Sequence, residues 1–193
     1  MRNVIVTGGS GGLGTELVRR LSSDYHCIVL GHHDVDLTDE TSAREAFARI
    51  GEVYGLVHLV GGYAPGASFD AWNRMLAVNA TAAFLAMQHV QLAKPGRIVA
   101  VSSIATLTPS SGSLAYVVAK SALNALVASL AEEHRGKGVT VNAVLPDAMA
   151  TPAMLKEMDA SKLVPLERVC ETIAFLLSDA AAGTSGALLP IRA

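Results

Sequence analysis

Tyr116 and Lys120 lie four residues apart in the run Tyr116-Val117-Val118-Ala119-Lys120. In a helix this spacing places both side chains on one face, where a phenol and an ammonium can share one site. A nearby cation lowers the pKa of a phenol, so the phenol can give a proton to a developing alkoxide, or take one from an alcohol, near neutral pH. The pair predicts general acid–base chemistry; the alternative is a surface lysine beside a packed tyrosine.

A glycine-rich segment, Thr7-Gly8-Gly9-Ser10-Gly11-Gly12-Leu13-Gly14, directly follows a short apolar run and precedes a helical pattern. Glycines at such a junction allow the backbone to approach a ligand closely, and the amino end of the helix attracts phosphate. The segment predicts a pyrophosphate cradle for a dinucleotide, whereas a flexible turn is the plainer interpretation.

Ser103 follows the expected strand at Arg97 to Ser102, and parallel sheets bind ligands beyond the carboxyl ends of their strands. Its hydroxyl is therefore a candidate to bind a substrate oxygen, unless Ser102 and Ser103 only terminate the strand by local hydrogen bonds. Asn79 is a poor helix former in an apolar helical setting, so its amide needs hydrogen-bond partners, either in a site or in the core.

Short β-branched runs alternate with longer stretches of helical period, which predicts an α/β fold: a doubly wound parallel sheet of about seven strands with helices on both faces. The expected strands lie near Asn3 to Thr7, Cys27 to Gly31, Leu56 to Val60, Arg97 to Ser102, Val139 to Leu145 and Ala187 to Ile191, with a very short one around Val35. The expected helices are Leu13 to Ser22, Ser42 to Ile50, Phe69 to Leu92, Leu114 to Arg135 and Leu166 to Leu177.

The composition favours one globular domain over residues 1–193, with 51% hydrophobic and 17% charged residues. A net charge of −2 without long basic runs argues against nucleic acid as a partner. We expect no membrane span, because no uninterrupted apolar run approaches 18 residues, and no metal site, because His32 and His33 are adjacent and point apart. Two distant cysteines, Cys27 and Cys170, indicate reduced thiols in a cytoplasmic protein.

Taken together, the motifs resemble those of the short-chain dehydrogenases/reductases, and the resemblance covers nearly the whole chain. The segment from Thr7 to Gly14 is similar to the family's TGxxxGxG cofactor loop, and Asp36-Leu37-Thr38-Asp39 to its adenine-contacting segment. Asn79 resembles the family's helical asparagine. Ser103 and the YxxxK pair have the family's thirteen-residue spacing, and Val141-Asn142-Ala143 leads into Pro146 and Thr151 as in its members.

The resemblance implies a single-domain Rossmann-type fold and an NAD(P)(H)-dependent oxidoreductase that reduces a carbonyl or oxidises an alcohol by hydride transfer. It implies that Tyr116 is the proton donor or acceptor, that Lys120 binds the nicotinamide ribose and lowers the tyrosine pKa, that Ser103 orients the carbonyl, and that Asn79 anchors a relay water. The predicted cofactor-binding residues are Gly8, Ser10, Gly11, Gly12, Leu13, Gly14, His32, Asp36, Leu37, Gly61, Gly62, Tyr116, Lys120, Pro146, Met149 and Thr151.

Some positions depart from the family pattern. The chain has Leu59-Val60-Gly61-Gly62-Tyr63 where Asn-Asn-Ala-Gly is usual, Pro146-Asp147 where Pro-Gly is usual, and only Pro152 to Pro165 as a substrate-covering segment. The run Val60 to Ala64 is similar to that of dihydropteridine reductase, so reduction of a pterin or related cyclic substrate is an alternative function. Ser103, which that branch lacks, favours simple carbonyl or alcohol chemistry. A cofactor-sensing protein without catalysis is the alternative from another class.

Cofactor choice depends on the residues after the second strand, where an acidic side chain binds the ribose of NAD and a basic one binds the extra phosphate of NADP. The sequence there is Leu30-Gly31-His32-His33, which favours NADP(H) over NAD(H), with Asp34 as an alternative ribose partner. The alanine-rich helices Phe69 to Leu92 and Leu114 to Arg135, together with the resemblance, suggest a homodimer through these helices, although they also suit packing on the sheet.

Overall fold

Six short runs form the strands of one parallel sheet, in the spatial order β2-β1-β3-β4-β5-β6. The computed structural model describes residues 1–66 and 68–193. The single-domain α/β prediction is confirmed, with a sheet close to the expected size. The strands are β1 (Arg2–Thr7), β2 (Tyr25–Leu30), β3 (Glu52–His58), β4 (Gln91–Val101), β5 (Val139–Pro146) and β6 (Leu188–Ile191).

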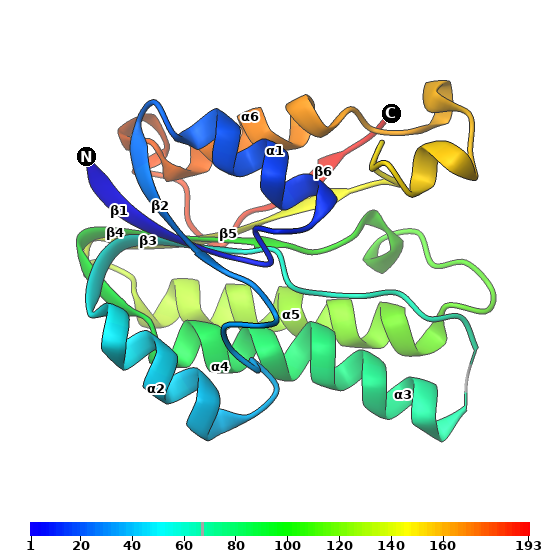
Figure 1. Cartoon of the computed structure of the whole chain (residues 1–193), viewed down its shortest axis with the longest axis horizontal. Helices are drawn as coiled ribbons and strands as arrows, with labels where there is room; N and C mark the ends of the chain where they lie inside the picture. Colours follow the sequence, from blue (N-terminus) through cyan, green and yellow to red (C-terminus); the bar gives the residue numbers. More distant parts are fainter. Residues whose placement is uncertain (67) are drawn as a thin grey trace.

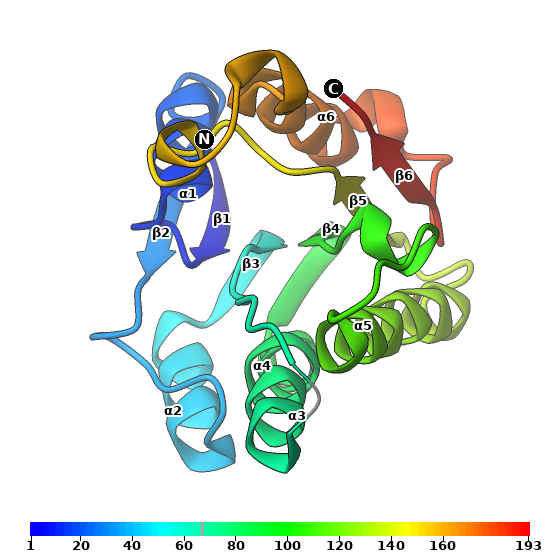
Figure 2. The ribbon, with the colours of Figure 1, turned by 90° about the vertical axis from the view of Figure 1, so that its right-hand side faces the viewer.

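Helices cover both faces of the sheet, α1 and α6 on one face and α2, α3, α4 and α5 on the other (Figure 1). Because all strands run the same way, their carboxyl ends meet at one edge, which faces the viewer in Figure 2. The helices are α1 (Gly12–Leu21), α2 (Glu40–Ile50), α3 (Phe69–Leu76), α4 (Ala82–His89), α5 (Leu114–Glu133) and α6 (Leu166–Leu177).

The alternation of side chains along each strand divides the core into two layers. In β1, Val4 and Val6 pack with the cluster under α1 and α6, whereas Ile5 packs with the cluster under α2, α4 and α5. All three side chains are fully buried. A strand buried on both faces needs apolar residues at successive positions, which is why the centre of β1, Val4-Ile5-Val6, shows no polar alternation.

The very short strand expected around Val35 is not formed, so the sheet has six strands and β2 is an edge strand. Residues 32–34 form a turn, and Asp34 accepts a hydrogen bond from the Gly31 amide at 2.8 Å. Val35 and Leu37 are 7% and 5% exposed and pack into the core beside α2. Their apolar character therefore reflects burial of a loop, because among the described residues no strand lies beyond β2 in the sheet.

The helix expected from Phe69 to Leu92 is wrong in two respects. It consists of α3, a π-helical turn (Ala77–Thr81) and α4, and it ends at His89 rather than Leu92. Gln91 and Leu92 instead pair with Glu52 and Val53 at the start of β3. Helical spacing of apolar residues could not reveal this boundary, since each pairing partner lies 39 residues earlier in the chain.

A buried polar pair links the carboxyl ends of β1 and β3. Thr7 and His58 are neighbours in register, with 3.0 Å between Thr7 Oγ1 and His58 Nδ1, and both side chains are fully buried. Burial, aided by the positive charge of Lys120, lowers the pKa of His58 to about 3. The imidazole is therefore neutral at physiological pH, and the hydrogen bond fixes the two strand ends from which the next loops depart.

Candidate active site

The glycine-rich segment forms a tight turn between β1 and α1. Gly8 has φ +72°, a conformation that favours glycine, and a Cβ on Gly14 would lie 2.5 Å from the Gly8 carbonyl oxygen. Within the described part of the chain, no side chain caps the amino end of α1, whose N-cap residue is Gly11, and its first turn has no acidic residue. The free amides and the helix dipole therefore suit a phosphate group.

A cavity of about 550 Å³ opens beside this turn, between β1, β2 and the ends of β3 and the π-helical turn. Of the predicted cofactor-binding residues, it is lined by Gly8, Ser10, Gly11, His32, Asp36, Leu37 and Gly61. Its remaining lining residues, which the sequence analysis did not name as cofactor contacts, are Leu30, Gly31, Val35, Thr38, Leu59, Val60, Val78 and Ala82. The apolar walls, the glycine cradle and the uncapped helix fit the adenosine and pyrophosphate of a dinucleotide.

Two carboxylates lie near the end of β2 and differ in their surroundings. Asp36 lines the cavity, and its Oδ1 accepts hydrogen bonds from the amide and the hydroxyl of Thr38, at 2.8 and 2.7 Å. These bonds lower the pKa of Asp36. Asp34 instead binds the Gly31 amide and does not line the cavity. The exposed His32 also lines the cavity. Its ring centroid lies 3.7 Å from that of His33, so the expectation that these adjacent side chains point apart is wrong.

Thr151 and Pro152, on the segment after β5, lie directly over Gly12, where a Cβ would be 3.3 Å from each of them. Met149 forms an isolated bridge to Val164, and its side chain packs against the core under α1 and α6. Pro146 ends β5 and is buried. These predicted cofactor residues therefore belong to a segment that is tied back to the fold at Val164 and covers the start of α1.

Leu13 and Gly14 are buried in the first turn of α1. Leu13 packs in the core under α1 and α6, and Gly14 packs against the glycine turn. These two predicted cofactor residues therefore shape the cradle by packing.

Asn79, Gly61 and Lys120 meet at the edge of the cavity. A Cβ on Gly61 would lie 2.7 Å from Asn79 Oδ1 and 2.9 Å from Lys120 Nζ, so only glycine leaves room for both polar groups. The Asn79 amide donates to the carbonyls of Gly62 and Met75 and accepts from the Gly62 amide at 3.1 Å. One amide proton and the Oδ1 of Asn79 thus hold Gly62 in the loop after β3, and the other amide proton bonds the Met75 carbonyl in α3.

Lys120 is only 4% exposed and donates a hydrogen bond to the Val101 carbonyl at 2.9 Å, at the end of β4. Burial lowers its pKa to about 8. One helical turn earlier, Tyr116 is half-buried, and burial raises its pKa while interaction with the Ser103 hydroxyl opposes that rise. The expected lowering of the tyrosine pKa by Lys120 is not seen, since burial outweighs the opposing effects at this phenol.

Ser103 is 8% exposed and begins a 3₁₀ turn (Ile104–Thr106) beyond the end of β4. Its Oγ accepts a hydrogen bond from the Ala105 amide at 3.2 Å. Tyr63, which is in neither the predicted catalytic set nor the predicted cofactor-binding set, is 61% exposed and packs edge-on against Tyr116, with 5.3 Å between ring centroids. An aromatic ring therefore stands beside the candidate proton donor.

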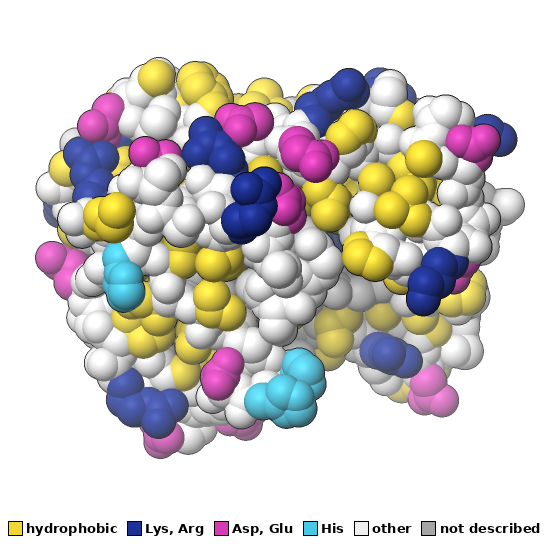
Figure 3. Space-filling model, turned by 45° about the horizontal axis from the view of Figure 1, so that its top comes forward, with side chains coloured by type: hydrophobic (Ala, Val, Ile, Leu, Met, Phe, Trp, Pro, Cys, Tyr) yellow, Lys and Arg dark blue, Asp and Glu magenta, His cyan; other side chains and the backbone are white. Residues whose placement is uncertain are grey.

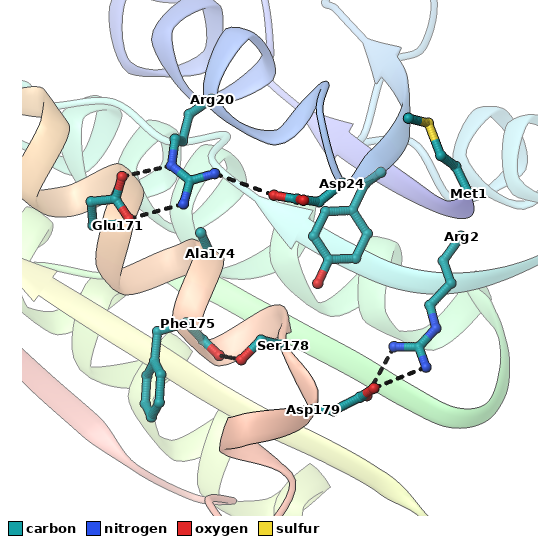
Figure 4. A pocket seen from close by; sticks show the side chains of 10 residues that line it. Met1, Arg2, Arg20, Asp24, Glu171, Ala174, Phe175, Ser178 and Asp179 are labelled. Carbon is teal, nitrogen blue, oxygen red and sulfur yellow. Dashed lines mark hydrogen bonds and ion pairs between the residues drawn. The ribbon is translucent and has the colours of Figure 1, made fainter.

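A second cavity, of about 610 Å³, lies at the opposite edge, where β1 and β2 begin (Figure 4). Arg20 binds Glu171 at 2.6 Å and lies 3.4 Å from Asp24, while Arg2 binds Asp179 at 2.8 Å. These pairs neutralise one another and connect α1 and β1 to α6 and the turn that follows it. None of the predicted site residues lines this cavity.

The described residues, 1–66 and 68–193, include no group of three or more His, Cys, Asp or Glu side chains that could hold a metal ion. On the face seen in Figure 3, positive and negative side chains are interspersed around exposed hydrophobic ones. The phenol of Tyr116, the hydroxyl of Ser103 and the ammonium of Lys120 lie at the same edge of the sheet as the cavity beside the glycine turn.

Comparison with known proteins agrees with this arrangement. A family model described as enoyl-(acyl carrier protein) reductase matches residues 2–192. The chain is 30% identical to cis-4-hydroxycyclohexanecarboxylate dehydrogenase of Sinomonas cyclohexanicum, over 98% of this chain and 94% of that protein.

Solved structures show the same likeness. An oxidoreductase of the short-chain dehydrogenase/reductase family from Burkholderia thailandensis is 27% identical, with a TM-score of 0.86 over 98% of this chain and 90% of that one. BdcA in complex with NADPH, 24% identical, has the same fold, with a TM-score of 0.87 over 98% of this chain and 92% of that one.

The contact at Gly61 gives a steric test. In Gly61→Ala the new methyl group would collide with Asn79 and Lys120, so we expect a loss of about 1–3 kcal/mol in the free energy of unfolding. Gly62→Ala is the matched control, because its Cβ would lie at an ordinary 3.7 Å from Val78 Cγ2, and its effect should stay within about 0.5 kcal/mol. Urea denaturation of both variants provides the measurement, and equal losses would contradict the steric interpretation.

Proposed function

The chain belongs to the short-chain dehydrogenase/reductase family, and from that membership we propose that it interconverts an alcohol and a carbonyl by NAD(P)(H)-dependent hydride transfer. The observation that carries the proposal is that Tyr116, Ser103 and Lys120 lie at the same sheet edge as the dinucleotide-sized cavity. Gly61 is the physical link, since it lines the cavity and also contacts Lys120 and Asn79.

Each side chain has a role in this proposal. The Ser103 hydroxyl binds the substrate oxygen. Its Oγ accepts a hydrogen bond from the Ala105 amide through one lone pair, which leaves the hydroxyl proton of Ser103 available to donate. The Tyr116 phenol gives a proton to that oxygen during reduction and removes it during oxidation. A bound nicotinamide would supply or accept the hydride. Lys120 and Asn79 keep the loop after β3, α5 and the end of β4 in fixed relation.

The family resemblance assigns Asn79 a relay water. The contacts of its side chain support a different emphasis, because both amide protons already bind the carbonyls of Gly62 and Met75. We therefore assign Asn79 primarily to holding Gly61 and Gly62, and any water at this position must find its donors elsewhere.

The cofactor-binding residues are proposed as predicted, with the glycine turn for the pyrophosphate and Asp36 and Leu37 at the adenosine end. Met149 and Thr151 belong to the segment that covers the start of α1 and would bind the nicotinamide end. NADP(H) is favoured because His32 lines the cavity, while Asp34 is occupied by the Gly31 amide. A cytoplasmic location is proposed from the sequence, because two widely spaced cysteines, Cys27 and Cys170, suit reduced thiols better than a disulfide framework.

The substrate is proposed to be a small molecule with an apolar body. Tyr63 beside Tyr116 offers an aromatic surface to a ring, and the relative from Sinomonas cyclohexanicum is named for oxidation of a cyclic alcohol. Absorbance assays identify the substrate class. Reduction is tested with NADPH and NADH against cyclic ketones, aldehydes, quinones and quinonoid dihydropterin. Oxidation is tested with NADP⁺ and NAD⁺ against cis-4-hydroxycyclohexanecarboxylate and other cyclic alcohols. Turnover restricted to the pterin would favour the pterin alternative, and tight cofactor binding without turnover would favour the sensor.

The role of Tyr116 predicts a specific kinetic defect. In Tyr116→Phe, turnover should fall roughly 10²- to 10⁴-fold because general acid–base catalysis is lost, whereas the Kd for the cofactor should change little. Cofactor fluorescence titration and steady-state kinetics on the same preparations provide the measurement. Unchanged turnover would exclude Tyr116 as the proton donor, and a large rise in Kd would give it a binding role instead.

The role of His32 predicts a change in cofactor preference. His32→Ala should weaken NADPH binding about 3- to 10-fold, as expected when a solvent-exposed hydrogen bond worth about 1 kcal/mol is lost, and leave NADH binding nearly unchanged. His33→Ala is the matched control, because this exposed neighbour does not line the cavity. Fluorescence titrations with both nucleotides are the measurement, and an equal effect of the two variants would refute the assignment.

A homodimer is proposed through α4 and α5. By length and composition alone, α5 is apolar enough to cross a membrane. Only 28% of its most apolar 18-residue window is buried, so much of its apolar surface is left without a partner in the monomer. Phe84 on α4 and Leu114 on α5 are 48% and 58% exposed. A second copy packed on these helices would bury their apolar surface.

Light scattering at micromolar concentration should give twice the monomer mass. In Phe84→Glu, a charge at the interface should prevent association, and the measured mass should fall to that of the monomer. A monomeric wild-type protein contradicts the proposal.

A further inference from the structure

Asn124 continues the face of α5 that contains Tyr116 and Lys120. The three residues are spaced by four, so their side chains emerge along one stripe of the helix. Asn124 is half-buried, and its Nδ2 donates a hydrogen bond to Thr106 Oγ1 at 3.0 Å. Neither the family motifs nor the acid–base mechanism uses this asparagine.

Thr106 connects Asn124 to Ser103 through a second hydrogen bond. Its Oγ1 donates a hydrogen bond to the Ser103 carbonyl at 2.9 Å, in addition to the 3.2 Å bond from its own backbone amide to the same oxygen. Because a hydroxyl has one proton, Thr106 can donate to Ser103 only if it accepts from Asn124. The amide of Asn124 therefore fixes the direction of both bonds.

The turn that this contact holds also orients the Ser103 hydroxyl. Ile104–Thr106 is a three-residue 3₁₀ turn, which has little stability of its own. Within it, the Ala105 amide binds Ser103 Oγ at 3.2 Å. A displacement of the turn away from α5 would move Ala105 and rotate the serine hydroxyl relative to Tyr116.

The oxygen of the Asn124 amide gives a second indication. Asn124 Oδ1 is buried and has no hydrogen-bond partner among the described residues. A buried acceptor without a partner costs free energy, and an aliphatic side chain of similar size would avoid that cost, so the bond to Thr106 is the polar contact that this side chain contributes.

We propose that Asn124 is a positioning residue for the reaction: through Thr106, its side-chain amide holds the 3₁₀ turn that orients the Ser103 hydroxyl against Tyr116. The inference rests on the proposed function, since Ser103 acts on the substrate oxygen only if the protein is the dehydrogenase/reductase inferred above. It adds a link between α5 and the serine that is independent of Lys120.

Steady-state kinetics test the effect on turnover. Asn124→Leu and Thr106→Val remove the two hydrogen bonds with little change in volume, and each should lower kcat about 10- to 100-fold while KM and the cofactor Kd stay within about threefold. Thr106→Ser retains the hydroxyl and should restore most of the lost activity. Thr108→Val is the matched control: it removes a hydroxyl that binds only the Ile104 carbonyl, at 3.3 Å, and kcat should stay within about twofold.

The Ser103→Ala background separates positioning from a general loss of stability. If Asn124 acts through the serine hydroxyl, Asn124→Leu should cause no further loss of kcat in Ser103→Ala. An equal loss in both backgrounds, or a loss of thermal stability with unchanged kcat in the folded fraction, would overturn the proposal.

A titration without substrate distinguishes failure of this inference from failure of the proposed function. With ¹³C-labelled tyrosine, the Tyr116 resonance can be assigned by its absence in Tyr116→Phe, and its pKa followed by NMR. Because interaction with Ser103 lowers the pKa of Tyr116, Asn124→Leu and Thr106→Val should raise it, and Thr108→Val should leave it unchanged. An unmoved Tyr116 pKa in the first two variants contradicts the positioning role, whether or not a substrate has been found.

Discussion

The position of α5 against the sheet depends on one buried cation. Lys120 lies almost wholly out of solvent and binds the last carbonyl of β4, so the helix cannot slide or rotate without leaving an ammonium unpaired in a low-dielectric interior. Desolvation opposes this arrangement, as the lowered pKa of Lys120 indicates. The compensating free energy comes from the apolar packing of Leu123 and Val127 on the sheet and of Ala119 against Met75 of α3, so the site depends on the stability of the core.

Absent side chains matter as much as present ones. Gly61 leaves the volume in which Asn79 and Lys120 approach each other, and Gly14 lets α1 pack on the turn that follows β1. In both places the neighbouring atoms are polar groups or backbone that cannot move aside cheaply. The departure at Gly61-Gly62 from the usual family pattern is thus compatible with the site, because the Asn79 side chain bonds both the amide and the carbonyl of Gly62.

The parallel sheet explains why residues from distant segments converge. All six strands end at one edge, so the glycine turn after β1, the loop after β3, Ser103 after β4 and the segment after β5 are neighbours there (Figure 2). The chain adds β2 on one side of β1 and β3 on the other, so the strand order reverses at β1. The cavity lies at this reversal, as expected for doubly wound sheets. The opposite edge carries charged pairs that connect helices and strands.

The sequence by itself determined what depends on short spacing: the glycine turn at a strand–helix junction, the shared face of Tyr116 and Lys120, and the α/β class. Only the tertiary structure decided what depends on distant partners. Val35 and Leu37 are loop residues because no strand pairs with them, and Gln91 is a strand residue because Glu52 does. Likewise, only the structure shows that the Gly31 amide binds Asp34, whereas Asp36 lines the cavity. The contact of Asn124 with Thr106 spans eighteen residues and two elements, and no local period encodes it.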